Sequence, residues 1–306
     1  MEQRSFFVTM SDGHNIFVRT YAPSKKRIGH IHILHGMSEH SGRYENFAEK
    51  LCDEGYFVTA HDHRGHGFTA QKNGMFGYFG PENGFELVVD DVVEVLSFLK
   101  KKETTERPIL FGHSMGSFIA RRFIQQHSDK IERLILSGTG SPTLLHKAGH
   151  IIAKQLVNMQ GAQIQSDLMN DLSFSSFNRK IKDAKTNFDW LTTDEEEVQK
   201  FIDDPFCGVI PTNQFFVDLT GGMLKMEDEQ ANARIRSDLK ILVANGTYDP
   251  IAGPEAEGAF RVGKLLARAG VEHVKVHIFE GMRHEILNEK KKEQVREIIV
   301  RWLKDE

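Results

Sequence analysis

The chain has few cysteines, little excess of either charge and no long apolar run. Its two cysteines, Cys52 and Cys207, form no C-x-x-C pair, which argues against a disulfide scaffold and against a cysteine-based zinc site. Lysine plus arginine (39) nearly balance aspartate plus glutamate (43), so nothing electrostatic points to nucleic-acid binding. No apolar run approaches the roughly 18 residues of a membrane span, and no basic region leads into an apolar stretch at the N-terminus. We therefore expect a cytoplasmic, mostly reduced protein.

What the chain does have is a regular alternation of short apolar runs and amphipathic segments. Its 306 residues are 40% hydrophobic and 27% charged, which is typical of a folded protein. The patterns predict strands at 4–10, 15–21, 31–34, 56–60, 109–111, 133–136, 241–244 and 274–279, and helices at 44–54, 86–100, 118–126, 255–269 and 285–303. This alternation predicts an α/β fold with a mostly parallel central sheet and helices on both faces. The first two strands, joined by a Ser-Asp-Gly turn, would form an antiparallel hairpin at the edge.

The middle of the chain follows another pattern, because no comparable strand occurs between Pro142 and Asp238. We therefore expect a first part of the core (1–141), an inserted helical cap (142–238) and a second part of the core (239–306). Apolar cap residues predicted to line a tunnel are Ile151, Ile152, Leu156, Val157, Met159, Phe174, Phe177, Phe215, Phe216 and Met223. Gly221-Gly222 is a candidate hinge, and an exposed apolar face would let the cap rest transiently on a membrane or micelle.

The strongest local motif is Gly112-His113-Ser114-Met115-Gly116, which lies between an expected strand and an expected helix. A nucleophilic serine can occupy such a strained turn when small residues flank it. That serine needs a base to take its proton and an acid to orient the base. Asp249 and His284 follow Ser114 in the required order, and each comes after an expected strand. Loops at the carboxyl ends of parallel strands converge, so we expect these three side chains to meet.

Other residues compete for two of these roles. Glu280 could replace Asp249 as the acid that orients the histidine. His277 lies inside the last expected strand among apolar neighbours, which favours a structural role, and His273 precedes that strand, which is too early for the base.

Acyl transfer also needs hydrogen-bond donors for the oxyanion of the tetrahedral intermediate. The N–H of Met115 follows the serine at the start of a helix, and the N–H of Met37 lies in the loop after the third strand. These two are the candidate donors. Several histidines near the motifs lack the spacing of a zinc signature, so we expect neither a metal nor a cofactor: His35, His61, His63, His66 and His113.

Three segments together resemble one branch of the α/β-hydrolase superfamily, which contains monoacylglycerol lipases and bacterial lysophospholipases. They are His35–Tyr44 (HGMSEHSGRY), Asp62–Gly67 (DHRGHG) and Gly112–Gly116 (GHSMG). The similarity extends over nearly the whole core, from Ser11 to Trp302. The resemblance implies a catalytic triad of Ser114, Asp249 and His284, with Met37 and Met115 as oxyanion donors. It also implies that Glu39 and Arg43 hold the polar head of a glycerol ester.

These observations predict a serine ester hydrolase that works through an acyl-enzyme on a small lipid ester, namely a monoacylglycerol or a lysophospholipid. Within enzymes, the alternative substrate is a small ester, a thioester or a peptide amide. A non-catalytic ligand-binding member of the fold is the alternative from another class, although a binding protein has no need of all three triad residues. Dehalogenases and epoxide hydrolases are disfavoured because the elbow carries Ser114 in place of an aspartate.

Overall fold

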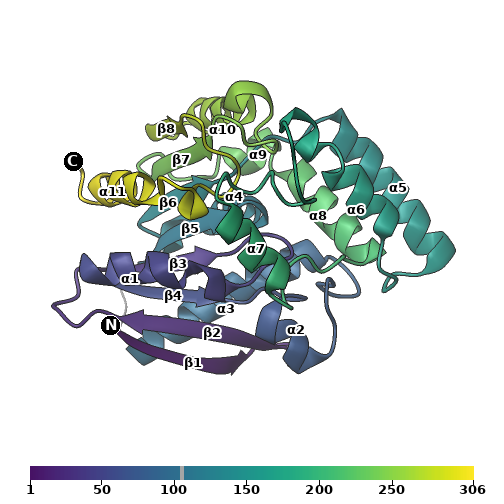
Figure 1. Cartoon of the computed structure of the whole chain (residues 1–306). Coiled ribbons are helices and arrows are strands. Elements are labelled where there is room, and N and C mark those ends of the chain that lie inside the picture. The colour runs from purple at the N-terminus through teal and green to yellow at the C-terminus, as the bar shows by residue number, and fades with distance from the viewer. Residues whose placement is uncertain (104–106) are drawn as a thin grey trace.

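The structure, a computed structural model, describes residues 1–103 and 107–306, and one eight-stranded sheet runs through it (Figure 1). Its strands are β1 (Glu2–Thr9), β2 (Asn15–Ala22), β3 (Gly29–Leu34), β4 (Tyr56–His61), β5 (Ile109–His113), β6 (Arg133–Ser137), β7 (Lys240–Gly246) and β8 (His273–Phe279). Their order across the sheet is β1-β2-β4-β3-β5-β6-β7-β8. β1 and β2 form the predicted antiparallel hairpin, and β2 is antiparallel to β4. All neighbours from β4 to β8 are parallel, so the predicted mostly parallel sheet is confirmed.

Helices cover both faces because the parallel strands send alternate apolar side chains to opposite sides. Ile135 faces α1 (Glu45–Asp53) and α11 (Lys292–Leu303) on one side. Its neighbours Leu134 and Leu136 face α3 (Gly84–Glu103), α4 (Met115–His127) and α10 (Glu257–Arg268) on the other. The two predicted layers of helices are therefore both present.

Some boundaries differ from those predicted. The last helix begins at Lys292 instead of Glu285, because the carboxylates of Glu285 and Glu289 bind other parts of the chain. A short 3-10 turn, Ile286–Asn288, replaces the predicted first part of that helix. The helix after the serine motif begins earlier than predicted, at Met115. α2 (Gly67–Asn73) was not predicted, since its seven residues are too few and too polar to show helical periodicity.

The insertion between β6 and β7 holds α5 (Leu144–Gln160), α6 (Asp167–Phe174), α7 (Glu195–Asp203), α8 (Asn213–Lys225) and α9 (Glu229–Asn232). No strand occurs among the described residues of 142–238, where two residues form one isolated bridge. α8 joins the main hydrophobic cluster of α3 and α4 through Phe215 and Phe216. No helix of the described chain is both long and apolar enough to cross a membrane.

The predicted hinge at Gly221-Gly222 is wrong. Both residues lie inside α8. A Cβ atom on Gly222 would lie 2.2 Å from the ring of Phe85 in α3, so glycine is needed there for close helix packing. Gly222 therefore lets α8 pack closely against the core.

Candidate active site

Ser114 lies on a sharp turn between β5 and α4. Its backbone has φ 52° and ψ −119°, a conformation that is strained for any residue except glycine. Its N–H donates to the carbonyl of Ser137 in β6 at 2.9 Å, which ties the turn to the sheet. A Cβ atom on Gly116 would lie 2.2 Å from the carbonyl oxygen of Leu34, so glycine lets α4 approach β3 this closely. The turn therefore has the strain and the flanking space that a nucleophile elbow requires.

Asp249 and His284 form a buried, hydrogen-bonded pair. His284 Nδ1 lies 2.9 Å from Asp249 Oδ1, and the two residues are 2% and 0% exposed. They follow the neighbouring strands β7 and β8, where the sequence places them. Asp249 also accepts the Ile251 N–H and the Asn245 side-chain amide, each at 2.9 Å. These donors stabilise the carboxylate and fix its orientation toward the imidazole.

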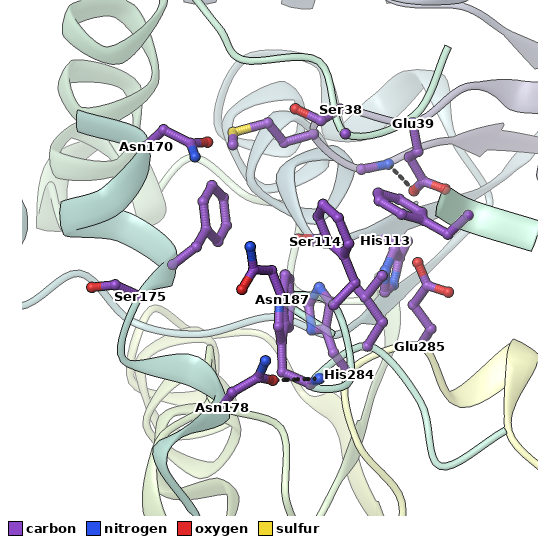
Figure 2. A pocket seen from close by; sticks show the side chains of 18 of the residues that line it. Ser38, Glu39, His113, Ser114, Asn170, Ser175, Asn178, Asn187, His284 and Glu285 are labelled. Carbon is purple, nitrogen blue, oxygen red and sulfur yellow. Dashed lines mark hydrogen bonds between the residues drawn. The ribbon is translucent and has the colours of Figure 1, made fainter. Parts of the chain in front are cut away.

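Ser114 and His284 line the same cavity, which has a volume of about 260 Å³ (Figure 2). Within the described chain no hydrogen bond joins the serine hydroxyl to the imidazole; such bonds often tighten only when substrate is bound. The competing residues are engaged elsewhere. Glu280 accepts the hydroxyl of Thr247 at 3.2 Å, and His277 lies inside β8. The fold thus brings Ser114 and His284 to one cavity, with Asp249 buried behind the imidazole, and leaves the rivals outside it.

The carboxylates around His284 favour its protonated form. Burial alone would lower the pKa of His284, but the charge and hydrogen bond of Asp249 outweigh it, and Glu285 and Glu39 add to the effect. The pKa is therefore raised from its ordinary value of 6.5. An imidazole with a raised pKa is a stronger base, provided that the pH leaves it neutral.

We expect kcat/KM to rise with pH and to reach half its maximum above pH 6.5. Only neutral His284 can accept a proton, and its raised pKa moves that titration upward. A soluble aryl ester assayed between pH 6 and pH 9 measures the profile, and circular dichroism at each pH separates ionisation from unfolding. A midpoint below pH 6 with the protein folded would show that His284 is not the titrating base.

Met37 and Met115 place two backbone N–H groups beside Ser114. Met115 is the first residue of α4, so its N–H has no helical partner one turn earlier. In the part of the chain that the structure describes, no backbone carbonyl accepts either N–H. Both residues line, with Ser114, a second cavity of about 510 Å³. Met37 and Met115 thus remain the candidate oxyanion donors, and the start of α4 adds positive potential there.

A buried ion-pair network supports the loop that carries Met37. Arg43 donates to both oxygens of Glu285, at 2.5 and 2.7 Å, and to Glu39 at 2.8 Å. Glu39 also accepts the N–H of Gly36 at 2.5 Å and the hydroxyl of Tyr44 at 2.8 Å. Burial would raise the pKa of Glu39, but the adjacent Arg43 charge lowers it to about 2, so Glu39 is ionised at neutral pH. The head-group role predicted for Glu39 and Arg43 stays a prediction, and these contacts favour positioning of the loop instead.

Three further residues of the site were not predicted from the sequence. Glu285 directly follows His284, and its position beside a predicted triad member was the one available signal. Asn245 bonds Asp249, but nothing in its local sequence marks that role. The ring of Trp190 lies 5.0 Å from the His284 ring, centre to centre. Trp190 belongs to the insertion, so only the tertiary fold brings it there.

The two cavities at Ser114 differ in character. The smaller one is lined by polar and apolar groups; the polar groups of the insertion include Asn170, Ser175 and Asn187 (Figure 2). Asp171 and the aromatic ring of Trp190 also line it. No lysine or arginine of the described chain lines it. The larger cavity is lined mainly by apolar side chains such as Met169, Leu172, Phe216, Leu219 and Met223.

The predicted tunnel lining is correct in part. Phe174, Phe177, Phe216 and Met223 line the larger cavity, as predicted. The other predicted residues do not line it: Ile151, Ile152, Leu156, Val157, Met159 and Phe215. Ile151 and Met159 are 62% and 79% exposed, whereas Phe215 is buried in the main core. Helical spacing could not show that Ile151 and Met159 point outward while Leu156 packs into the core.

One group of side chains has ligand types suited to a metal ion. Within the described chain, ligand atoms of His40, Asp204 and Cys207 lie within 4.8 Å of one another. However, Nδ1 of His40 accepts the N–H of Gly42, so the proton of the neutral ring sits on Nε2. That proton points at Asp204 Oδ2, 2.8 Å away, and occupies the position that a metal would need. The donor set therefore does not fit a metal ion.

Comparisons with known proteins show what the chain is similar to. A family model described as "Serine aminopeptidase, S33" matches residues 25–291. A monoacylglycerol lipase of Mycolicibacterium smegmatis is 23% identical over 296 residues, which cover 95% of this chain and 93% of that protein. An uncharacterised abhydrolase domain-containing protein of Dictyostelium discoideum is 24% identical over 303 residues; the match covers 96% of this chain but 28% of that protein.

A solved structure extends the comparison to three dimensions. A highly thermostable carboxyl esterase from Bacillus coagulans, in complex with glycerol, superimposes with a TM-score of 0.92 and 26% identity, covering 100% of this chain and 99% of that one. The resemblance and the fold predicted from the sequence are thereby confirmed. The chain belongs to the serine aminopeptidase S33 family, a family of α/β hydrolases with lipase and esterase relatives.

Proposed function

We propose that the protein is a serine ester hydrolase whose triad is Ser114, His284 and Asp249. The observation that carries the proposal is the buried Asp249–His284 pair, whose imidazole lines the same cavity as the strained Ser114. Ser114 Oγ attacks the ester carbonyl, and its proton passes to His284 Nε2. The N–H groups of Met37 and Met115 bind the oxyanion. His284 then gives the proton to the departing alcohol, which leaves an acyl-Ser114 ester.

Water then hydrolyses the acyl-enzyme, with the same catalytic groups in the same roles. His284 takes a proton from a water molecule, which attacks the acyl carbonyl. The second tetrahedral intermediate collapses, Ser114 regains its proton from His284 and the carboxylic acid is released. Asp249 keeps its charge throughout and stabilises the imidazolium that forms in each half-reaction.

The two cavities support a substrate with an apolar acyl chain and a small neutral polar head. The apolar cavity of about 510 Å³ suits the acyl chain, and the smaller cavity of about 260 Å³, which has more polar groups in its lining, suits the leaving alcohol. A phosphate group in the smaller cavity would lie near Asp171, and no lysine or arginine of the described chain lines that cavity to pair with it, which costs free energy. We therefore favour monoacylglycerols over lysophospholipids, in line with the monoacylglycerol lipase among the relatives.

A panel of substrates with one acyl chain tests this choice. We expect kcat/KM for a monoacylglycerol to exceed that for the matching lysophosphatidic acid by at least tenfold, about 1.4 kcal/mol. An aryl ester, an acyl thioester and an aminoacyl arylamide complete the panel and report on the reaction class. Equal rates on the two lipids would contradict the head-group proposal, and turnover of the arylamide alone would favour a peptidase.

We further propose that residues 142–238 act as a cap that can rest on a lipid surface. Exposed apolar side chains of α5, α6 and the connection between them support this: Leu144, Leu145, Ile151, Ile152, Met159, Ile164, Leu168 and Leu172. In α5 several of them recur seven residues apart, which places them along one stripe. Such a stripe is suited to the interface between water and acyl chains. Flotation with vesicles of monoacylglycerol and phosphatidylcholine measures the binding, and Ile151→Ser with Met159→Ser should reduce it.

A further inference from the structure

One segment of the insertion, Asp189–Val209, contacts both loops that carry the candidate catalytic groups. We call this segment the strap. At its first end it meets the loop of His284: Leu191 accepts the N–H of Glu285 at 2.7 Å. Arg283, the residue before His284, donates to the carbonyls of Asp189 at 2.6 Å and Thr192 at 2.9 Å. The loop of His284 is therefore bonded to the strap on both sides of the imidazole.

Glu289, which lies outside the strap just before α11, binds this end of the strap to the histidine loop. Its side chain is buried, with the residue 2% exposed. Its Oε1 accepts the N–H of Thr193 in the strap at 3.1 Å and the N–H of Arg283 in the histidine loop at 2.9 Å. Its Oε2 accepts the hydroxyl of Thr193. One carboxylate thus joins the backbone of the strap to the backbone next to His284.

At its second end the strap meets the loop that carries Met37. The N–H of Gly208 donates to the carbonyl of Ser38 at 2.9 Å, and the Ser38 hydroxyl donates to the carbonyl of Val209 at 2.7 Å. Asp204 Oδ2 lies 2.8 Å from Nε2 of His40. Ser38 has φ 54°, so the backbone beside Met37 is held in a strained conformation by these contacts.

Between its two ends the strap packs on the ion-pair network of Glu39, Arg43 and Glu285. α7 forms its middle, with Phe201 buried and its ring 4.9 Å from the Arg43 guanidinium. Trp190 packs on His284 at the start of the strap. In Figure 1, α7 lies over the middle of the molecule, whereas α5, α6 and α8 lie together at its right. The strap is thus a part of the insertion that is bonded to the catalytic loops, in contrast to the exposed face of α5.

We propose that the strap is a fixed brace that holds the His284 loop and the Met37 loop in register, with Glu289 and Asp204 as its positioning residues. The proposal rests on the triad proposed above. Neither residue touches the reacting atoms; both act through the backbone on which His284 and Met37 sit. Movement of the brace would displace the base and the oxyanion donor together, so it would lower kcat without weakening substrate binding to the same extent.

Kinetics test the role of each end. We expect Glu289→Ala to lower kcat by about 10-fold to 100-fold with little change in KM, because misplaced catalytic groups cost that much. Glu289→Gln should retain most of the activity, since its Oε1 can still accept both N–H groups and its amide can donate to Thr193. Glu293→Ala is the matched control, because the Glu293 carboxylate is exposed and, within the described chain, pairs only with Arg296 on α11, and it should behave like the unchanged protein. Losses of equal size in the Ala and Gln variants would overturn the role of Glu289.

The brace also predicts that its two ends are coupled. Asp204→Ala should lower kcat, and the double variant with Glu289→Ala should lose less than the product of the single losses. Hydrogen exchange gives a readout that does not depend on activity. In Glu289→Ala, exchange should rise at 36–40 as well as at 189–194, although Glu289 does not contact residues 36–40. Exchange that rises only at 189–194, together with losses in kcat that multiply in the double variant, would overturn the brace and leave the proposed triad intact. If the unchanged protein has no hydrolase activity but exchange rises at both ends in Glu289→Ala, the proposed function would be wrong and the brace would stand.

Discussion

Replacing Asp249 with asparagine should lower kcat about 10⁴-fold, the loss typical of a serine hydrolase whose orienting acid becomes an amide. Asp249 accepts three donors, from His284, Ile251 and Asn245. An asparagine has one accepting oxygen, and where its amide NH2 faces the imidazole the Nδ1 proton has no acceptor. The ring then takes the tautomer whose Nδ1 accepts from that amide, so the free Nε2 lone pair is lost.

Steady-state hydrolysis of an aryl ester measures this loss, and thermal unfolding shows whether the variant is folded. Asp238→Asn is the control, because Asp238 lies on the surface just before β7 and its salt bridge is with Arg236. A folded Asp249→Asn protein that keeps more than a tenth of the original kcat would show that another acid orients His284.

The second large effect expected is a cooperative unfolding in mild acid. Six buried histidines lie on β3, β4 and the loops that follow them: His30, His32, His35, His61, His63 and His66. Burial lowers their pKa values, to about 3 for His30 and His66, to about 4 for His35 and well below 6.5 for the others. Repulsion between neighbouring imidazoles adds to the shift, as between His32 and His61.

The direction of the pH effect follows from which state binds the protons. Between pH 6.5 and about pH 4 the unfolded chain protonates these histidines, whereas the folded protein keeps them neutral. Each such histidine lowers the free energy of unfolding by up to about 1.4 kcal/mol per pH unit below 6.5. Because a domain has about 5–15 kcal/mol of stability, six of them are enough to unfold it within about two pH units.

We therefore expect full stability above pH 6.5 and an acid transition centred near pH 5. Far-UV circular dichroism against pH gives the midpoint, and urea unfolding at pH 5 and pH 7 gives the change in free energy. His273→Gln is the control, because the His273 side chain is exposed at the edge strand and should leave the midpoint unchanged. A free energy of unfolding that is the same at pH 5 and pH 7 would contradict the account.

Much of the fold could be predicted from the sequence because it depends on local patterns. The parallel strands β3 to β7 are short apolar runs, β1 and β2 flank a turn, and the buried stripe of α3, with Val88, Val92 and Leu99, repeats with helical spacing. The start of α11 could not be predicted in this way. Glu285 and Glu289 favour a helix by propensity, but their carboxylates bind Arg43 and Thr193 in the folded protein. Tertiary contacts of single side chains therefore decide where that helix begins.

The residues of the candidate site also fall into two groups, those that could be predicted from the sequence and those that depend on tertiary contacts. Ser114, Asp249 and His284 could be found because chain order and position after a strand follow from topology. The partners of Glu39 and Arg43 could not, since a charged pair that binds substrate and one that braces a loop look alike in sequence. The contacts of Trp190 with His284, and the outward direction of Ile151, likewise depend on how the insertion packs on the core.

The central claim is that one hydroxyl, that of Ser114, becomes the nucleophile. Reaction with a fluorophosphonate, followed by peptide mass spectrometry, locates the modified side chain directly. We expect one adduct, on the peptide that contains Ser114, with labelling abolished in Ser114→Ala and strongly slowed in His284→Ala. An adduct on another serine, or labelling of Ser114→Ala at the rate of the unchanged protein, would contradict the account.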